Sequence, residues 1–446
     1  MEPLRGEHST VGETAVVTRG CRLGPGAVRT VLETDRRPRF GWATPTESIA
    51  AAGAAATVTG GGPSRFDDVR AATEALFDSC ETPSGGLPSV ARPRLFGGFA
   101  FHHGDHDGEG SPWADFPGAA FFLPEVQVTE RDGDRWLTTA AAGEDAADRA
   151  EALLTTWKER LADEPATEVG RGPGIASRER TPSQAAWRDQ VARAISSVEE
   201  GRLRKVVLAQ ALRVHLRSDL SVPDVFARLA ETYPDCYRFL FSPADRATFY
   251  GATPERLVSL RGRTVRTEAL AGSTGRGDTP AEDEWLAAEL LDSTKDIHEH
   301  ELVAEAIRDQ LDPYAASVRI GDRTVRRLAT VQHLRTSITA ELADDEHVLS
   351  LVDALHPTPA VGGLPPDEAL RTIRETEAFD RGWYAAPIGW VDAAGNGTFA
   401  VGLRSAVATE RTATLFAGAG IVADSDPDRE WDEVQLKYRP MLDELE

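Results

Sequence analysis

The chain has 446 residues, enough for two or three average domains or for one large enzyme core with a smaller lobe. Its formal net charge of −23 and hydrophobic content of 41% indicate a folded protein with an acidic surface and argue against nucleic acid as a partner. No signal-peptide core or membrane-length apolar stretch is found, and three scattered cysteines lack CxxC spacing, so we expect a cytoplasmic protein without membrane contact.

Residues 1–165 contain short apolar segments separated by glycine and proline, for example 95–101, 119–124 and 126–128. These segments predict strands of an antiparallel sheet, followed by a helix over residues 144–162. Residues 166–180 are polar and contain glycine and proline, which predicts a linker before a second region at 181–446. His102, His103 and His106 predict a polar surface loop, with metal binding as the alternative.

The second region begins with a predicted helix. Thr181 is expected to cap it, with Pro182 at the first helical position, and the helix should end near residue 200. A strand starting at Lys205 should follow, and then strands at 237–241, 248–251 and 257–260. Long helices are predicted over residues 282–311 and 428–445.

Lysine is rare in this chain, with only four residues: Lys158, Lys205, Lys295 and Lys437. Arginine can replace lysine wherever positive charge is sufficient, but it cannot lose its proton in a protein. Lys205 begins an apolar run, and burial favours the neutral amine. Lys205 is therefore the first candidate for a general base. The combination of acidity with arginine in place of lysine is also typical of halophilic proteins.

Carboxylates follow one stripe on each of the two long helices. Asp292, Asp296 and Glu299 occur at helical spacing in the first helix, and Glu430, Glu433 and Lys437 in the second. One interpretation is two solvated faces with an ordinary ion pair, and the other is carboxylates that converge on Mg²⁺. A zinc site at His298 and His300 is disfavoured, because residues two apart on a helix point in different directions.

Two glycine-containing loops, 268–275 and 415–422, have small residues that let the backbone approach a ligand. They are either plain turns or sites where backbone amides hold a carboxylate. Neither has the spacing of a dinucleotide or phosphate loop, so nucleotide binding is disfavoured.

Taken in chain order, these stretches resemble the motifs of the chorismate-utilising enzymes, and among them most closely the isochorismate synthases. The resemblance rests on seven motifs between residues 181 and 446, namely KVVLA at 205–209, TPE at 253–255, LAGS at 270–273, KDIHEHELV at 295–303, HPTPAVGG at 356–363, RGWY at 381–384, and FAGAGIV at 416–422 with EWDE at 430–433.

The resemblance implies a fold of the mixed α/β (α+β) type, in which a large antiparallel sheet sandwich is flanked by helices and the region 1–165 contributes to it. It also implies a Mg²⁺-dependent conversion of chorismate to isochorismate. Lys205 would activate water and Glu255 would protonate the departing hydroxyl. Glu299 and Glu433 would hold Mg²⁺, with Asp296 and Glu430 as outer partners through water. The implied substrate-binding residues are Gly272, His333, Arg404, Gly418 and Lys437.

Several alternatives stay open within this resemblance. Lys205 stands where ammonia-using relatives such as anthranilate synthase carry glutamine, so we expect water as nucleophile and no glutamine amidotransferase subunit. Salicylate synthase shares the water chemistry, and a siderophore pathway is the alternative to menaquinone synthesis. A noncatalytic chorismate-binding paralogue would not need both Lys205 and Glu255. His333 has an alternative as an ordinary core histidine.

Overall fold

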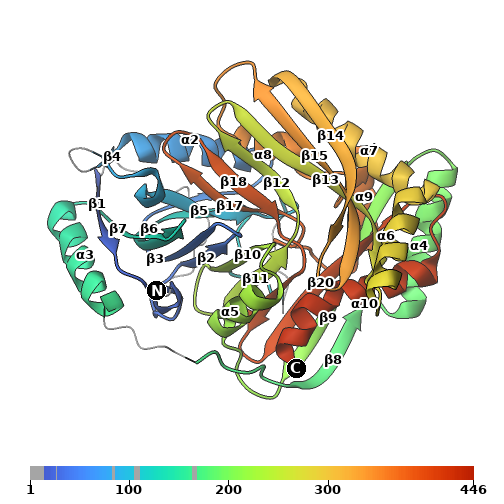
Figure 1. Cartoon of the computed structure of the whole chain (residues 1–446), viewed down its shortest axis with the longest axis horizontal. Coiled ribbons are helices and arrows are strands. Elements are labelled where there is room, and N and C mark those ends of the chain that lie inside the picture. Colours follow the sequence, from blue (N-terminus) through green and yellow to red (C-terminus); the bar gives the residue numbers. More distant parts are fainter. Residues whose placement is uncertain (1–14, 27, 83–85, 105–110, 163–167) are drawn as a thin grey trace.

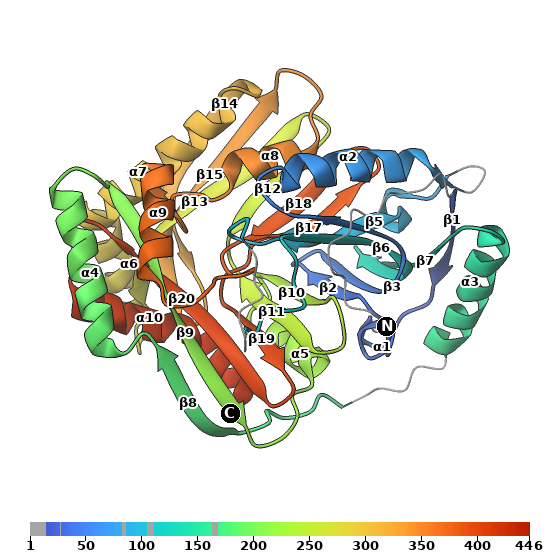
Figure 2. The same cartoon turned by 180° about the vertical axis from the view of Figure 1, so that it is seen from behind.

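A computed structural model describes residues 15–446 except 27, 83–85, 105–110 and 163–167. Within these residues the chain forms a large curled antiparallel sheet flanked by helices, which confirms the predicted fold class (Figure 1). Helices α4, α6, α7, α9 and α10 gather at one end of the molecule and α3 lies at the other, as both views show (Figures 1 and 2). No helix in the described part of the chain is long and apolar enough to cross a membrane.

The strands are β1 (Val16–Leu23), β2 (Arg39–Ala43), β3 (Glu47–Gly60), β4 (Cys80–Glu81), β5 (Arg94–Phe99), β6 (Ala119–Arg131), β7 (Asp134–Ala142), β8 (Ile175–Thr181), β9 (Lys205–Leu216), β10 (Tyr237–Ser242), β11 (Ala247–Thr253), β12 (Arg256–Arg261), β13 (Thr264–Gly275), β14 (Ala315–Arg327), β15 (Val331–Leu342), β16 (Gly363–Leu364), β17 (Pro387–Asp392), β18 (Gly397–Val401), β19 (Ser405–Thr409) and β20 (Thr412–Ile421).

The helices are α1 (Arg29–Leu32), α2 (Arg65–Asp78), α3 (Ala146–Ala162), α4 (Gln184–Glu199), α5 (Val222–Thr232), α6 (Pro280–Asp292), α7 (Thr294–Leu311), α8 (Val348–Leu355), α9 (Pro366–Thr376) and α10 (Pro427–Leu442), with single 3₁₀ turns at Ser89–Ala91 and Asp443–Leu445.

The two sequence regions share one sheet rather than forming separate sheets. A continuous antiparallel path runs β14-β15-β13-β12-β18-β17-β5-β6-β3-β2-β10-β11-β19-β20-β9-β8. Along this path the first region joins the second at β5–β17 and again at β2–β10. The residues predicted as a linker, 166–180, include the start of β8, which pairs with β9.

The predicted helix over residues 282–311 is two helices, so that prediction was wrong in its length. The chain leaves the helical conformation at Ser293, whose ψ is 112°. The Ser293 side chain accepts a hydrogen bond from the amide of Asp296 and caps α7, which is the preferred role of serine at a helix start. Asp292 therefore ends α6 and does not share the stripe of Asp296 and Glu299.

The start of α4 was also predicted wrongly. Thr181 is the last residue of β8, where it pairs with Ala211 of β9. Ser183 is the cap instead, because its side chain accepts a hydrogen bond from the amide of Ala186. Pairing with the sheet holds Thr181 in an extended conformation, which takes precedence over its local preference for a helix start.

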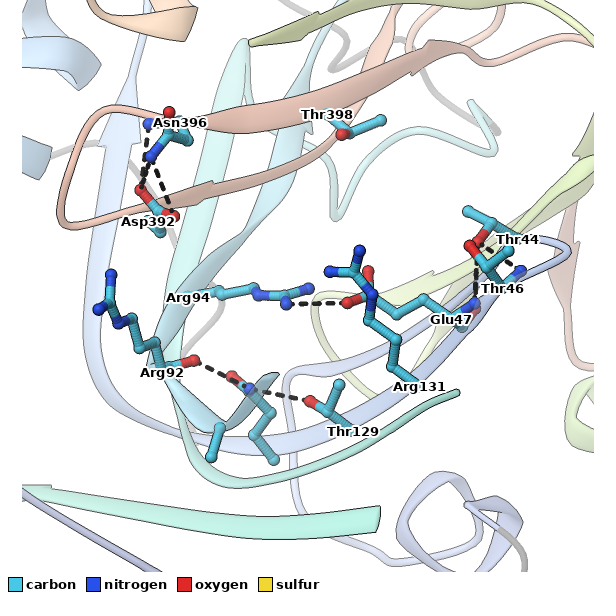
Figure 3. A network of polar contacts seen from close by, with 12 residues as sticks. Thr44, Thr46, Glu47, Arg92, Arg94, Thr129, Arg131, Asp392, Asn396 and Thr398 are labelled. Carbon is cyan, nitrogen blue, oxygen red and sulfur yellow. Dashed lines mark hydrogen bonds and ion pairs between the residues drawn. The ribbon is translucent and has the colours of Figure 1, made fainter. Parts of the chain in front are cut away.

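A buried polar network ties together strands of the first region with the β17–β18 hairpin (Figure 3). Arg94 donates to Glu47 at 2.9 Å and packs over the ring of Trp390 at 4.0 Å. Gln127 donates to the carbonyl of Arg92 at 3.2 Å. The network fixes β3, β5 and β6 against β17 and supports the sheet far from the helices α6, α7 and α10.

Aromatic packing joins the two regions as well. Trp113, from the loop before β6, stacks on Phe416 of β20 with ring centroids 5.3 Å apart. Its ring also packs against Phe249 of β11 at 5.3 Å. A side chain on Gly382 would collide with the Trp113 ring, so glycine is required there for this close approach.

Candidate active site

A cleft of about 1090 Å³ lies where the two ends of the sheet path approach each other beneath α6, α7 and α10. Strands β9 and β20 line it from one side, and β13 and β15 from the other. All nine residues that the sequence predicted for the site line this cleft: Lys205, Glu255, Gly272, Glu299, His333, Arg404, Gly418, Glu433 and Lys437. The structure therefore brings together residues that are up to 232 positions apart in the chain.

Lys205 is the first residue of β9, and only 1% of its side chain is exposed. Its ammonium nitrogen lies 2.9 Å from Oε1 of Glu299 on α7. Burial is the largest single influence on Glu299 and opposes its ionisation. The charge and hydrogen bond of Lys205, together with the more distant charges of Lys295 and Lys437, outweigh burial, so the pKa of Glu299 is lowered. Gly420 faces this pair, and a side chain there would collide with both residues. The predicted base is thus a buried cation bound to a predicted metal ligand.

A second buried ion pair holds β9 in place next to Lys205. The guanidinium of Arg381 donates to the carbonyls of Val207 at 2.8 Å and Val361 at 2.9 Å. Its partner Glu377 accepts the amide hydrogen of Ala209 at 2.8 Å. Arg381 belongs to the RGWY motif, but no role was predicted for its pair with Glu377. Both residues lie beyond the end of α9 in non-helical chain, so their spacing of four residues was not a signal of pairing.

Glu255 lies between β11 and β12, and its side chain is buried. Burial first, and then the nearby carboxylate of Glu268, raise its pKa to about 8, while Lys205 and Lys437 act in the opposite direction. Near neutral pH this carboxyl group holds a proton, which is the state required of a general acid.

The carboxylates of α10 are also paired with lysines. Glu433 lies 2.7 Å from Lys437, whose ammonium also donates to the carbonyl of Gly418 at 2.8 Å. Glu430, which is 2% exposed, lies 3.2 Å from Lys295 of α7. Burial and then the charge of Glu433 raise the pKa of Glu430 to about 7. The sequence had given Lys295 no function, and the structure shows it joining α7 to α10.

The donor atoms at this end of the cleft are suited to a hard divalent cation. Asp296, Glu299, Glu430 and Glu433 all line the cleft, and burial followed by like charges destabilises the ionised forms of Asp296 and Glu430. No group of three or more potential metal ligands is preassembled among the described residues. An ion held by Glu299 and Glu433 would keep free positions for water and substrate oxygens, as Mg²⁺ does in many sites. The residues therefore fit the predicted ion.

His333 and Arg404 form a hydrogen-bonded chain in the cleft. Arg404 donates to Nε2 of His333 at 2.9 Å, and Nδ1 of His333 lies 2.9 Å from the hydroxyl of Ser273. Burial, and then the charge of Arg404, hold the pKa of His333 well below its ordinary value, so the imidazole is neutral and Nε2 accepts. His333 thus lines the cleft and accepts a hydrogen bond from Arg404, which holds that guanidinium in place.

The two glycines predicted to bind substrate have different surroundings. Gly272 interrupts the regular register of β13 and has a φ of +76°, which favours glycine, and a side chain there would press against Asp296. Gly418 lies in the regular part of β20, opposite Ala209 of β9. The Gly418 carbonyl accepts a hydrogen bond from Lys437 and so holds the ammonium group of that lysine in place.

The histidines considered for metal binding do not form a site. His300 is buried and bonds to Thr336 at 2.8 Å, whereas His298 is exposed. His106 lies outside the described residues, and the described part contains no metal-ligand group that includes His102 or His103. The mouth of the cleft carries an unexpected residue, Trp285 of α6, whose side chain is 61% exposed.

Residues 15–446 match the family described as chorismate binding enzyme. The chain is 39% identical over 432 residues to the salicylate biosynthesis isochorismate synthase of Pseudomonas aeruginosa, covering 95% of this chain and 88% of that protein. It is 37% identical over 363 residues to the isochorismate synthase MenF of Bacillus subtilis, covering 80% and 75% of the two chains.

A solved structure has the same fold. MenF of Escherichia coli, described as a menaquinone-specific isochorismate synthase, superposes with a TM-score of 0.82 at 26% sequence identity, covering 97% of this chain and 95% of that one.

Proposed function

Because the chain belongs to the chorismate binding enzymes, as the match over residues 15–446 shows, we propose that it is an isochorismate synthase that converts chorismate to isochorismate. The observation that carries the proposal is one cleft that contains a buried lysine at the start of β9 and a buried, protonated Glu255. A reaction that adds water and removes a hydroxyl group needs a base and an acid of this kind.

In the proposed mechanism Lys205 takes a proton from water as the water oxygen bonds to C2 of the ring. The ring double bonds shift, the bond between C4 and its hydroxyl breaks, and Glu255 gives its proton to the departing oxygen. One water is consumed and one is released, so the product is an isomer of the substrate. Lys205 is paired with Glu299 in the structure and must lose its proton before it can act as a base.

The remaining residues supply binding and orientation. Arg404, fixed by His333, and Lys437 offer positive charge for the carboxylates of the substrate. Gly272 and Gly418 let the backbone approach the ligand. Glu299 and Glu433 would hold Mg²⁺, which when bound provides positive charge for a substrate carboxylate, and Asp296 and Glu430 would support them through water.

We further propose that the product serves menaquinone synthesis, supported by the similarity to MenF proteins of two bacteria. The similarity to a protein of salicylate biosynthesis keeps a siderophore or salicylate route as the alternative. Lys205 supports water rather than ammonia as nucleophile, so no glutamine amidotransferase subunit is expected. We expect the enzyme to act in the cytoplasm.

The test is incubation of the purified protein with chorismate and Mg²⁺, with the products identified by mass spectrometry and NMR. Isochorismate alone is the expected product. Salicylate together with pyruvate would show that the enzyme continues to elimination, and anthranilate formed on addition of ammonium would overturn the role of water. A protein that binds chorismate without turnover would instead be a noncatalytic relative.

A further inference from the structure

A buried charged cluster lies directly behind the proposed acid and has no role in the mechanism above. Its centre is Glu268 of β13, whose side chain is only 1% exposed. Arg335 of β15 binds one carboxylate oxygen at 2.5 Å, and Arg326 of β14 approaches the other at 3.4 Å. Two guanidinium groups compensate the charge of Glu268, which allows a carboxylate to persist at this depth.

The cluster is bonded to the peptide groups on both sides of Glu255. Arg326 donates to the carbonyl of Pro254 at 2.7 Å, and Glu268 accepts the amide hydrogen of Arg256 at 3.4 Å. A second nitrogen of Arg326 donates to the carbonyl of Asp235 at 2.9 Å, which anchors it to the segment before β10. The residues flanking Glu255 are therefore fixed from behind by β13 and β14.

We propose that Glu268 is a positioning residue for the acid, fixing the Glu255 loop together with Arg326 and placing a second negative charge behind it so that Glu255 keeps its proton until the leaving group takes it. This inference rests on the proposed function, because it assigns Glu268 to the proton-donating half of that reaction. Two carboxylates close together disfavour the ionised form of each other, and of the two only Glu268 is bound by Arg326 and Arg335.

The groups that face Glu255 from the surrounding elements all bear on its proton. Burial is the largest influence on its pKa and Glu268 is the second, acting in the same direction. Lys205 of β9 and Lys437 of α10 act in the opposite direction. The neutral imidazole of His333 and the guanidinium of Arg404 line the same cleft, and the other groups near Glu255 are the hydroxyls of Thr358 and Tyr384.

Two substitutions in the cluster should move the pH profile in opposite directions. Glu268→Gln removes the negative charge and leaves two arginines, so the loss of kcat/KM at high pH should begin about one pH unit lower than in the wild type. Arg335→Gln leaves Glu268 with less compensation, so the same limb should move to higher pH by a smaller amount, because Arg335 is 35% exposed. A loss of packing alone would not shift the two variants in opposite directions.

Glu47→Gln is the matched control, because it also removes a buried carboxylate bound to an arginine, but in the network of Figure 3. It should lower stability and leave the pH limb unchanged. Unshifted limbs in both cluster variants would overturn the inference.

A second measurement does not require turnover. The pKa of Glu255 is raised from 4.5 to about 8, so between these two pH values the folded protein holds a proton that the unfolded chain releases. The contribution of Glu255 to the free energy of unfolding therefore decreases as the pH rises from about 4.5 to about 8. The difference between wild type and Glu255→Gln isolates that contribution. In the Glu268→Gln background the same difference should level off about one pH unit lower. If it levels off at the same pH, the inference is wrong, even for a protein that makes no isochorismate and so fails the proposed function.

Discussion

Each lysine of the second region binds a carboxylate in the same cleft: Lys205 binds Glu299, Lys295 binds Glu430, and Lys437 binds Glu433. The three pairs differ in burial, and Lys205 is the most deeply enclosed at 1% exposure. The pairs differ in setting as well, because the partner of Lys205 lies on α7, whereas Lys295 and Lys437 both bind carboxylates of α10.

Replacement of Lys205 by arginine separates charge from proton transfer. Arginine can keep the ion pair with Glu299 but cannot lose its proton, so Lys205→Arg should lower kcat by at least about 100-fold. Steady-state kinetics with chorismate gives the change, and thermal unfolding shows whether the variant is folded. Lys158→Arg, the same substitution on an exposed face of α3, should leave kcat unchanged. Substantial turnover by a folded Lys205→Arg protein would remove this residue from the mechanism.

The protonation of Glu255 predicts the alkaline side of the pH profile. The acid must carry its proton, and its pKa is raised to about 8, so kcat/KM should fall as pH increases above that value. Initial rates between about pH 6 and 10 test this. Glu255→Gln should lose at least about 100-fold in rate at every pH in this range. A profile that stays flat up to about pH 10 would show that Glu255 is not the acid.

At the scale of elements, the position of the carboxylates depends on where α7 begins. Ser293 ends α6 and caps α7, and it places Glu299 in the second turn of the new helix, facing β9 and β20. If α6 continued without the break at Ser293, the residues of α7 would follow the axis of α6, and Glu299 would not face Lys205. The break could not be recognised from apolar spacing, because both helices fit one periodic pattern, although the serine itself was a local signal.

Loss of this cap should affect both stability and activity. Ser293→Ala should cost about 1 kcal/mol in the free energy of unfolding, since the amide of Asp296 loses its partner. It should also lower kcat/KM because α7 carries Glu299. Ser183→Ala removes the equivalent cap of α4, which has no residue in the cleft, and should cost a similar free energy without changing kcat/KM. Urea unfolding and steady-state rates distinguish the two variants; equal effects on kcat/KM would contradict the prediction.

At the scale of the whole molecule, four strands of the first region, β5, β6, β3 and β2, lie between β17 and β10 in the sheet. Strands β5 and β2 therefore complete the hydrogen bonding of strands from the second region. Removal of residues 1–165 would expose the edges of β17 and β10 and the apolar surface of Phe249 and Phe416 that Trp113 covers. We expect the two regions to unfold as one unit.

A substitution in the first region tests this. Trp157 of α3 is buried, and α3 packs against β1, β6 and β7. Trp157→Ala should cost about 3 kcal/mol or more, and hydrogen exchange should show reduced protection in β9 as well as in β6. Protection lost only in the first region would show that it unfolds independently.

The acidic surface predicts an effect of salt on the whole protein. With a formal net charge of −23, screening of repulsion should raise the melting temperature as NaCl increases from about 0.1 to 2 M. Calorimetry at neutral pH measures the shift. At about pH 5 fewer carboxylates are charged, so the salt effect should be smaller there. A melting temperature independent of salt at both pH values would contradict the prediction.

The fold class, the strand that begins at Lys205 and nine of the residues that line the cleft were predicted from the sequence, because apolar runs and ordered motifs are local features. The prediction of loops at 268–275 and 415–422 was wrong, because these stretches pair within the sheet as parts of β13 and β20. The partners of the cleft residues were not predicted. Glu268, Glu377 and Lys295 bind residues between 4 and 135 positions away, and only the folded sheet brings most of these pairs together. The cap at Ser183 was missed because Thr181 is held by strand pairing, a long-range contact.

Trp285, the exposed side chain at the mouth of the cleft, can serve as an intrinsic fluorescence probe of ligand binding. The chain has nine tryptophans, and among the described residues Trp285 is the large aromatic side chain most open to solvent, while the other eight are buried or half-buried. Acrylamide should therefore quench the red-shifted emission of Trp285 first. A ligand that fills the cleft would shield this indole, so fluorescence titration can follow occupancy without a label and without turnover.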